Sequence, residues 1–208
     1  MDRKAVPWLA NTSGRPVRSP DGRQAGRKSG RERAAAAKER RELRAQLTDP
    51  APVMEAAATF LAVRPRSISE TRRRLAKLGY PEPLVEHVIT RLVEMEYLDD
   101  ADFARGWVQS RDRAKPRGEI ALRRELLLKG VERAVIDDVL AQRAESAAGS
   151  DADRDAARAL LERRRAAFER IADPLKRRQR AYSLLARNGF DPETCREVSA
   201  GLVTAAAE

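Results

Sequence analysis

The sequence is poor in the residues that build chemical centres. Its 208 residues include one cysteine, Cys195, and one histidine, His87, which excludes an internal disulfide and a metal site made of several cysteines. Long apolar runs are also missing, because the longest near-apolar stretch, 53–63, contains Glu55 and is too short to cross a bilayer. We therefore expect a cytosolic protein without a membrane segment or a secretion signal.

Aromatic residues make up only 4% of the chain, and β-branched residues are scarce as well. Alanine, leucine, arginine and glutamate dominate, which favours helices over sheets. The formal net charge of +10 is uneven: residues 1–50 hold 13 Lys and Arg against 6 Asp and Glu, whereas residues 51–208 hold 29 against 26. The composition predicts an all-α protein with a basic N-terminal extension that attracts polyanions, nucleic acid first.

The extension differs in character from the remainder of the chain. Residues 1–30 combine glycine, proline, serine and arginine with almost no periodic apolar residues, so we expect them to be disordered. Residues 30–47 are rich in helix formers but have few core-facing positions, which predicts a partly helical, solvated segment. Pro50 and Pro52 then mark a domain boundary.

An internal repeat follows Pro52. Three segments have a leucine four positions before a glycine and an apolar residue directly after it, at 75–80, 126–131 and 185–190. A left-handed glycine brings two such apolar residues together in a Schellman cap. Gly79, Gly130 and Gly189 are therefore predicted helix caps, and their separations of 51 and 59 residues predict three tandem three-helix units.

Helix start signals support this division. They are the capping box at 67–70, Asp99, and the Asp-Pro pairs at 173–174 and 191–192. We predict nine helices, at 53–64, 67–78, 81–96, 99–114, 117–129, 132–145, 151–170, 174–188 and 191–206. The predicted divisions are the basic extension 1–50, repeat 1 at 51–98, repeat 2 at 99–146 and repeat 3 at 147–208.

No catalytic constellation is visible. His87 falls at a polar, solvated position of its predicted helix, and Cys195 lies on an apolar face without an activating partner. The aspartate pairs at 99–100 and 137–138 are adjacent in sequence, so helix capping or solvation explains them without a metal. We predict no enzymatic activity, no cofactor and no metal ion.

Three basic groups fall on corresponding helices. The first holds Arg72, Arg73, Arg74 and Lys77, the second Arg123, Arg124 and Lys129, and the third Lys176, Arg177, Arg178 and Arg180. The groups are candidate contacts to DNA phosphates or to carboxylates of a partner protein, and the first two are the stronger candidates. The alternative is that these long side chains only solvate a surface. The aromatic residues Phe103, Trp107 and Phe190 lie on apolar faces, where packing is favoured over base stacking.

Two interpretations stay open for the turn at 115–118, Lys-Pro-Arg-Gly. Lys115 and Arg117 project from a constrained turn, which is typical of a contact loop. The same four residues also fit an ordinary connector, in which Pro116 stops one helix and Gly118 eases the start of the next.

Three strings resemble, in order and spacing, the pattern of the RecX family. They are RSISE at 66–70, YLDDADFA at 97–104 and RGEIALRRELLLKG at 117–130. The resemblance covers about residues 53–205 and is weakest in the third unit. It implies an elongated, curved array of helix-turn-helix-like three-helix bundles that lies in the groove of a RecA–DNA filament and contacts adjacent RecA protomers.

The resemblance also implies a regulatory role in DNA repair by homologous recombination and in the SOS response. Family members are understood to block filament extension or to promote disassembly, which lowers the ATPase, strand-exchange and co-protease activities of RecA. The implied partners are the RecA filament, single-stranded DNA and, without sequence specificity, duplex DNA, and we expect a monomer. The alternatives are a stand-alone basic DNA-binding protein and, with least support, an enzyme.

Overall fold

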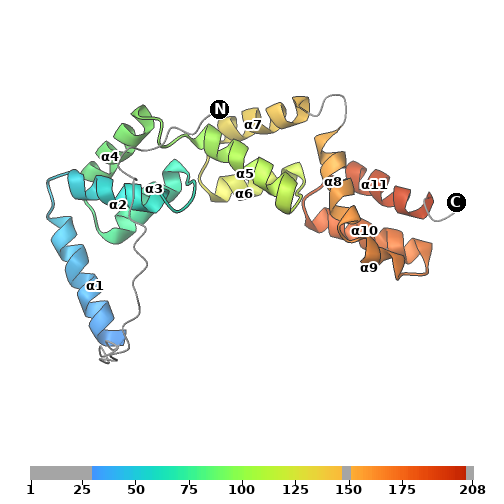
Figure 1. Ribbon diagram of the computed structural model, residues 1–208, viewed down its shortest axis with the longest axis horizontal. Coiled ribbons are helices and arrows are strands. Elements are labelled where there is room, and N and C mark those ends of the chain that lie inside the picture. Colours follow the sequence, from blue (N-terminus) through green and yellow to red (C-terminus); the bar gives the residue numbers. More distant parts are fainter. Residues whose placement is uncertain (1–29, 147–150, 205–208) are drawn as a thin grey trace, which may run out of the picture. The chain divides into compact units, whose positions relative to one another are not determined.

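The computed structural model describes residues 30–146 and 151–204, and every regular element in these ranges is a helix. The helices are α1 (Gly30–Ala45), α2 (Ala51–Leu61), α3 (Ile68–Leu78), α4 (Glu82–Glu94), α5 (Asp100–Ala114), α6 (Glu119–Leu128), α7 (Arg133–Glu145), α8 (Ala152–Glu162), α9 (Arg165–Glu169), α10 (Pro174–Arg187) and α11 (Pro192–Thr204). Figure 1 shows α2–α4, α5–α7 and α8–α11 as three successive groups. The predictions of an all-α fold and of tandem three-helix bundles are confirmed.

Residues 1–29, which the sequence predicts to be disordered, lie outside the described residues. The chain divides into two compact units, 1–38 and 39–208, and all three bundles belong to the second unit. The elongated, curved arrangement stays a prediction.

Bundle 1 is formed by α2, α3 and α4 around one apolar cluster. Its fully buried side chains include Val53, Leu75 and Val88. The predicted capping box is confirmed, because the Ser67 hydroxyl accepts a hydrogen bond from the Glu70 N–H at 3.0 Å.

The segment before Pro50 contributes to bundle 1, although the sequence predicts a boundary there. Leu47 packs against the bundle 1 core. The Arg44 guanidinium lies 5.3 Å from the centre of the Tyr80 ring and donates to the Leu78 carbonyl at 3.3 Å. A short apolar and aromatic contact of this kind leaves no periodic pattern in the sequence, so the segment resembles a solvated tail.

Bundle 2 is formed by α5, α6 and α7. Phe103, Leu122, Leu126 and Ile136 lie in its core. Asp99 is the predicted N-cap of α5, and its carboxylate accepts hydrogen bonds from the N–H groups of residues 101 and 102.

Bundle 3 is formed by α8 to α11, and Phe168, Leu185, Phe190 and Cys195 lie in its core. The predicted caps at Asp173 and Asp191 both accept hydrogen bonds from the N–H groups that follow them.

The described residues form eleven helices, two more than the nine predicted. One of the two is α1, which lies in the segment 30–47 and confirms the partial helix predicted there. The other arises because the predicted helix 151–170 breaks between α8 and α9. A straight helix would place Arg164 on the side that carries Ala157, Leu161 and Phe168, all of which are buried. The break leaves Arg164 exposed and still buries Phe168.

Candidate partner-binding surface

The three predicted cap glycines all have positive φ, at 94° for Gly79, 78° for Gly130 and 80° for Gly189. After α6 and α10, the N–H groups of the glycine and of the next residue bond carbonyls three and five positions back. This is the hydrogen-bond pattern of a Schellman cap. The conformation is costly for side chains other than glycine, which explains the spacing seen in the sequence.

Two of these glycines, Gly130 and Gly189, are also sites of close approach between bundles. A Cβ atom added at Gly130 would lie 2.4 Å from the Cβ of Ser69, and one added at Gly189 would lie 2.4 Å from the Cβ of Ala121. Both distances are shorter than the closest approach of two non-bonded carbon atoms in a folded protein. Each of these glycines therefore packs against the first turn of the middle helix in the preceding bundle.

These contacts form a joint that occurs twice in the chain. The Ser67 hydroxyl, at the N-cap of α3, donates to the Lys129 carbonyl at 2.6 Å. The Gly118 N–H, at the N-cap of α6, donates to the Asn188 carbonyl at 3.1 Å. In both joints the N-terminal end of one helix meets the C-terminal end of the next bundle's middle helix, so opposite partial charges face each other.

A carboxylate from the following bundle completes each joint. Asp100 accepts from the Ile68 N–H, and Asp153 accepts from the Glu119 N–H, both at 2.9 Å. Burial raises the pKa of both carboxyl groups in spite of these hydrogen bonds. Sequence reasoning explained Asp100 only as a capping or solvated residue, and the signal it missed was the repeat of the aspartate one bundle later.

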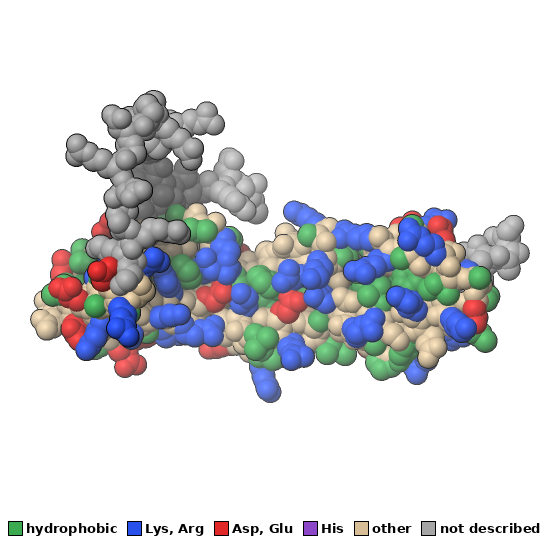
Figure 2. Space-filling view, turned by 90° about the horizontal axis from the view of Figure 1, so that it is seen from below, with side chains coloured by type: hydrophobic (Ala, Val, Ile, Leu, Met, Phe, Trp, Pro, Cys, Tyr) green, Lys and Arg blue, Asp and Glu red, His purple; other side chains and the backbone are tan. Residues whose placement is uncertain are grey.

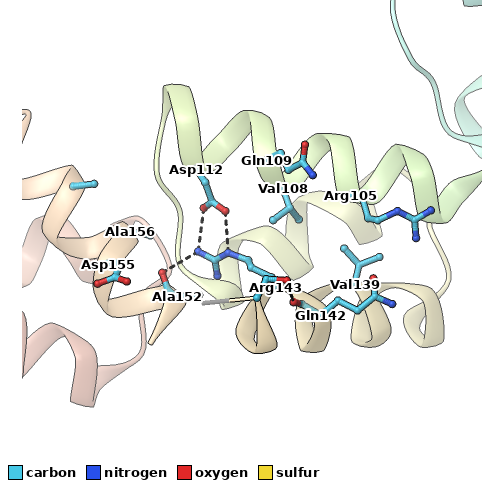
Figure 3. A pocket seen from close by; sticks show the side chains of 12 residues that line it. Arg105, Val108, Gln109, Asp112, Val139, Gln142, Arg143, Ala152, Asp155 and Ala156 are labelled. Atoms are coloured by element: carbon cyan, nitrogen blue, oxygen red, sulfur yellow. Dashed lines mark hydrogen bonds and ion pairs between the residues drawn. The ribbon is translucent and has the colours of Figure 1, made fainter. Parts of the chain in front are cut away.

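Arg143 on α7 connects this helix to α5 and α8. It donates to Asp112 at 3.0 Å and to Asp153 at 2.6 Å, and only 11% of its side chain is exposed. Burial opposes its charge, but the hydrogen bonds to the two carboxylates raise the pKa of Arg143. Figure 3 shows this guanidinium with Asp112 at the wall of a cavity of about 490 Å³ that α5, α7 and α8 line. The carboxylates neutralise the arginine, so the cavity offers no unpaired charge there.

Trp107 lies in a second polar cluster, between bundles 1 and 2. Its ring centre is 4.3 Å from the Arg111 guanidinium and 4.8 Å from the Lys129 ammonium. The indole N–H donates to Glu125 at 2.9 Å, and Lys129 pairs with Glu70 at 2.8 Å. Burial opposes the Glu70 charge, but Lys129 lowers the pKa of Glu70 overall. The predicted packing role of Trp107 therefore includes cations as well as apolar groups.

The first basic group is largely used inside the fold. Arg72 forms a bidentate pair with Glu86, at 2.6 and 2.9 Å. This hydrogen bonding raises the pKa of Arg72 and lowers the pKa of Glu86. Arg73 donates to the Lys129 carbonyl at 3.4 Å and so adds to the first joint. These two arginines are held by the protein itself.

The other two members of that group face outward. Arg74 lies 5.8 Å from the Phe60 ring centre, and Lys77 is exposed without an ion-pair partner among the described residues. Arg66, which sequence reasoning missed as a candidate, lies closer to the same ring, at 4.1 Å, and its Nε has no hydrogen-bond partner. The only sequence signal for this contact was the presence of Phe60 six residues before Arg66.

The second basic group divides in the same way. Arg123 pairs with Glu119 at 2.8 Å and with Asp137, and Lys129 belongs to the Trp107 cluster. Arg124 is exposed, and no described residue pairs with it. Of this group, Arg124 is the member available to a partner.

The turn at 115–118 combines features of both interpretations. Pro116 is buried, and Arg117 donates to the Asn188 side chain at 2.5 Å and lies 3.5 Å from Glu125. Arg117 is thus part of the second joint. Lys115 is exposed and is the only cation of this turn that points to solvent.

The third basic group, which the sequence ranked lowest, is the least paired. Arg178 and Arg180 are exposed, and neither has an ion-pair partner among the described residues. Lys176 forms a loose, exposed ion pair with Asp173 at 3.8 Å, and Arg177 donates to the Ile171 carbonyl. Sequence reasoning missed Arg187, which is exposed at the end of the same helix. Figure 2 shows Lys and Arg gathered on the face of bundle 3, with few acidic side chains among them.

The single histidine and the single cysteine lie in the surroundings that the sequence predicts. His87 is exposed and Cys195 is fully buried, as predicted, and burial raises the pKa of the Cys195 thiol. Within residues 30–146 and 151–204, no three His, Cys, Asp or Glu side chains are grouped to hold a metal ion. None of the helices in these ranges has the length and apolarity needed to span a membrane.

Comparison with known proteins follows the three bundles. Family models for the first, second and third three-helix domains of RecX match residues 54–92, 99–140 and 151–198. A "Regulatory protein RecX" from Mycobacterium sp. (strain JLS) is 37% identical over 67% of this chain and 75% of its own length. One from Prosthecochloris aestuarii is 31% identical over 76% of this chain and 97% of its own.

Two solved structures share the fold. The crystal structure of RecX from Lactobacillus salivarius has a TM-score of 0.62 at 16% identity and covers 74% of this chain and 96% of that one. A second crystal structure of a regulatory protein RecX has a TM-score of 0.60 at 19% identity, with 84% and 79% covered. Matches in all three bundles, together with relatives above 30% identity, show that this chain belongs to the RecX family of regulatory proteins.

Proposed function

We propose that this chain binds the filament that RecA forms on single-stranded DNA and restrains its extension. Restraint of the filament would lower the DNA-dependent ATPase, strand-exchange and co-protease activities of RecA. The observation that carries this proposal is the family match, which extends over all three bundles and not over one common helical motif.

The protein acts by surface contact in this proposal, without catalysis or a cofactor. It works in the cytoplasm as a monomer, and its repeats are 51–98, 99–146 and 147–208. The outward cations Arg74, Lys77, Lys115 and Arg124 supply contacts to the filament. The remaining candidates Arg72, Arg73, Arg117, Arg123 and Lys129 support these contacts from inside, because each bonds another part of the chain.

ATP hydrolysis by RecA on single-stranded DNA tests the proposal directly. Substoichiometric amounts of this protein should lower the steady-state rate, because a filament that cannot extend leaves DNA uncovered. The protein should also sediment with the filament. An unchanged rate together with no co-sedimentation would rule the proposal out.

The basic helix α10 favours a second candidate, a stand-alone DNA-binding protein. This helix contains Lys176, Arg177, Arg178, Arg180 and Arg187 and no acidic residue. Such a surface attracts phosphates without reading bases. Tight, sequence-selective binding to duplex DNA in the absence of RecA would support this candidate over the first.

A further inference from the structure

Helix α6 carries apolar side chains on its outer face. Ile120, Leu127 and Leu128 are 57%, 39% and 70% exposed. Together with Arg124 they occupy positions i, i+4, i+7 and i+8, which lie along one side of a helix. We name these four residues the α6 stripe.

The core does not need this stripe. The opposite side of α6 already holds Leu122 and Leu126, both fully buried in bundle 2. A helix that is apolar on both sides is typical of an element with a second packing partner. The described residues of this chain leave the apolar side chains of the stripe exposed to the fractions given above.

The other two middle helices provide an internal comparison. When α3, α6 and α10 are aligned on their cap glycines, the α6 stripe corresponds to Ser69, Arg73, Ala76 and Lys77 in α3 and to Gln179, Ser183, Ala186 and Arg187 in α10. All of these residues are polar or small, and two of them, Ser69 and Arg73, face the first joint. The repeat architecture therefore does not explain the large apolar side chains, which are specific to bundle 2.

The charges near the stripe narrow the choice of what covers it. Residues 1–29 carry seven Lys and Arg against two Asp and Glu, so Arg124 would repel them. A second copy packed antiparallel about a two-fold axis would bring the two Arg124 side chains together at the centre of the interface. Nucleic acid is also a poor match, because aliphatic side chains neither pair with phosphates nor stack on bases as aromatic rings do.

We propose that the α6 stripe docks on a protein surface that presents apolar side chains around a carboxylate, which pairs with Arg124. On the proposed function, from which this docking follows, that surface belongs to a RecA protomer of the filament. Burial of Ile120 and Leu128, the two most exposed apolar side chains of the stripe, supplies affinity, and the ion pair sets the orientation. The stripe thus binds protein, while cations elsewhere are left to meet DNA.

The test is a variant that makes the stripe polar, Ile120→Gln with Leu128→Gln, beside the matched control Leu43→Gln with Val63→Gln. The control residues are 62% and 75% exposed and lie outside both the stripe and α10. Binding is measured by co-sedimentation with RecA filaments on poly(dT) and by fluorescence anisotropy with poly(dT) alone. We expect the stripe variant to bind filaments about tenfold more weakly or worse, with unchanged affinity for poly(dT) and an unchanged circular dichroism spectrum. The control should bind both as the unaltered protein does.

A second variant, Arg124→Glu, changes charge without removing an apolar group and should also weaken filament binding. Equal filament binding by both variants and the unaltered protein would overturn the docking inference and leave the proposed function standing. A parallel loss of affinity for poly(dT) alone would overturn it in favour of nucleic acid, and a dimer that only the stripe variant dissociates would overturn it in favour of a second copy. Failure of the unaltered protein to bind filaments would overturn the proposed function and the inference together.

Discussion

Glycine has opposite effects at two positions of this chain. Gly189 has a φ of 80° and packs against Ala121, where an added Cβ would meet atoms at 2.4 Å. Gly106 lies inside α5, and an added Cβ there would meet nothing within 4 Å. Position 189 requires glycine for two reasons, its positive φ and the close packing, whereas Gly106 only weakens its helix.

Replacement by alanine should therefore change the free energy of unfolding in opposite directions at the two positions. Gly189→Ala should lower the free energy of unfolding by about 2 kcal/mol, because it adds both backbone strain and a steric overlap. Gly106→Ala should raise it by about 0.5 kcal/mol. Urea denaturation monitored by circular dichroism measures both, and a Gly189→Ala protein as stable as Gly106→Ala would contradict the structure of the joint.

The buried carboxylates predict a pH dependence. Burial raises the pKa of Asp100, so the folded protein holds this proton more tightly than the unfolded chain does. Its contribution to stability is thus largest below the ordinary aspartate pKa and declines as pH rises through the folded-state pKa. Asp100→Asn retains the acceptor for the Ile68 N–H and should raise the free energy of unfolding at pH 7, by an amount that shrinks on acidification.

Glu70→Gln is the matched comparison, because Lys129 lowers the pKa of Glu70 against the effect of burial. A lowered pKa contributes stability at neutral pH that is lost as pH falls. This variant should be less stable than the unaltered protein at pH 7, and the difference should close in acid. Thermal unfolding from pH 7 to pH 4 measures both variants, and the reverse order of their stabilities at pH 7 would refute the assignment.

At the scale of elements, the sequence predicted most helices because their ends carry local signals. Ser67, Asp99, Asp173 and Asp191 each cap the helix expected of them. The α8–α9 break was missed because Ala157, Leu161 and Phe168 keep helical spacing through it. Only the local part of the ion pairing could be predicted, such as the i,i+4 pair of Arg123 with Glu119. The other carboxylates that pair with Arg72 and Arg123 lie on neighbouring helices 14 residues away, beyond the reach of a local pattern.

The distribution of ion pairs among the basic side chains predicts that α10 contacts DNA. Arg180 on α10 has no partner among the described residues, whereas Arg165 on α9 pairs with Glu162 and Glu169. If Arg180 contacts a phosphate, Arg180→Gln should reduce the salt-dependence slope of single-strand binding by about 0.7. Arg165→Gln should leave the slope nearly unchanged. Equal slopes for the two variants, from binding titrations at several salt concentrations, would show that α10 does not contact DNA.

At the scale of the molecule, the bundles are connected by one joint used twice. Each joint combines a glycine cap, the N-terminal end of a middle helix and an aspartate of the following bundle. The glycine spacing of the sequence predicted the repeat, but the joint itself joins residues more than 30 positions apart, beyond the reach of local patterns. The fold thereby holds the α6 stripe and the α10 cations on one continuous scaffold.

Photo-crosslinking on the assembled filament tests most directly whether the scaffold presents separate protein-binding and DNA-binding surfaces. A photoreactive amino acid is placed at Leu128 of the α6 stripe, at Arg187 of α10, or at the exposed His87 of α4 as a control. We predict that Leu128 links to RecA protein, that Arg187 links to the single-stranded DNA, and that His87 links to neither above background. Links from Leu128 to DNA alone, or no links from Leu128 and Arg187 beyond those of the control, would contradict this division of surfaces.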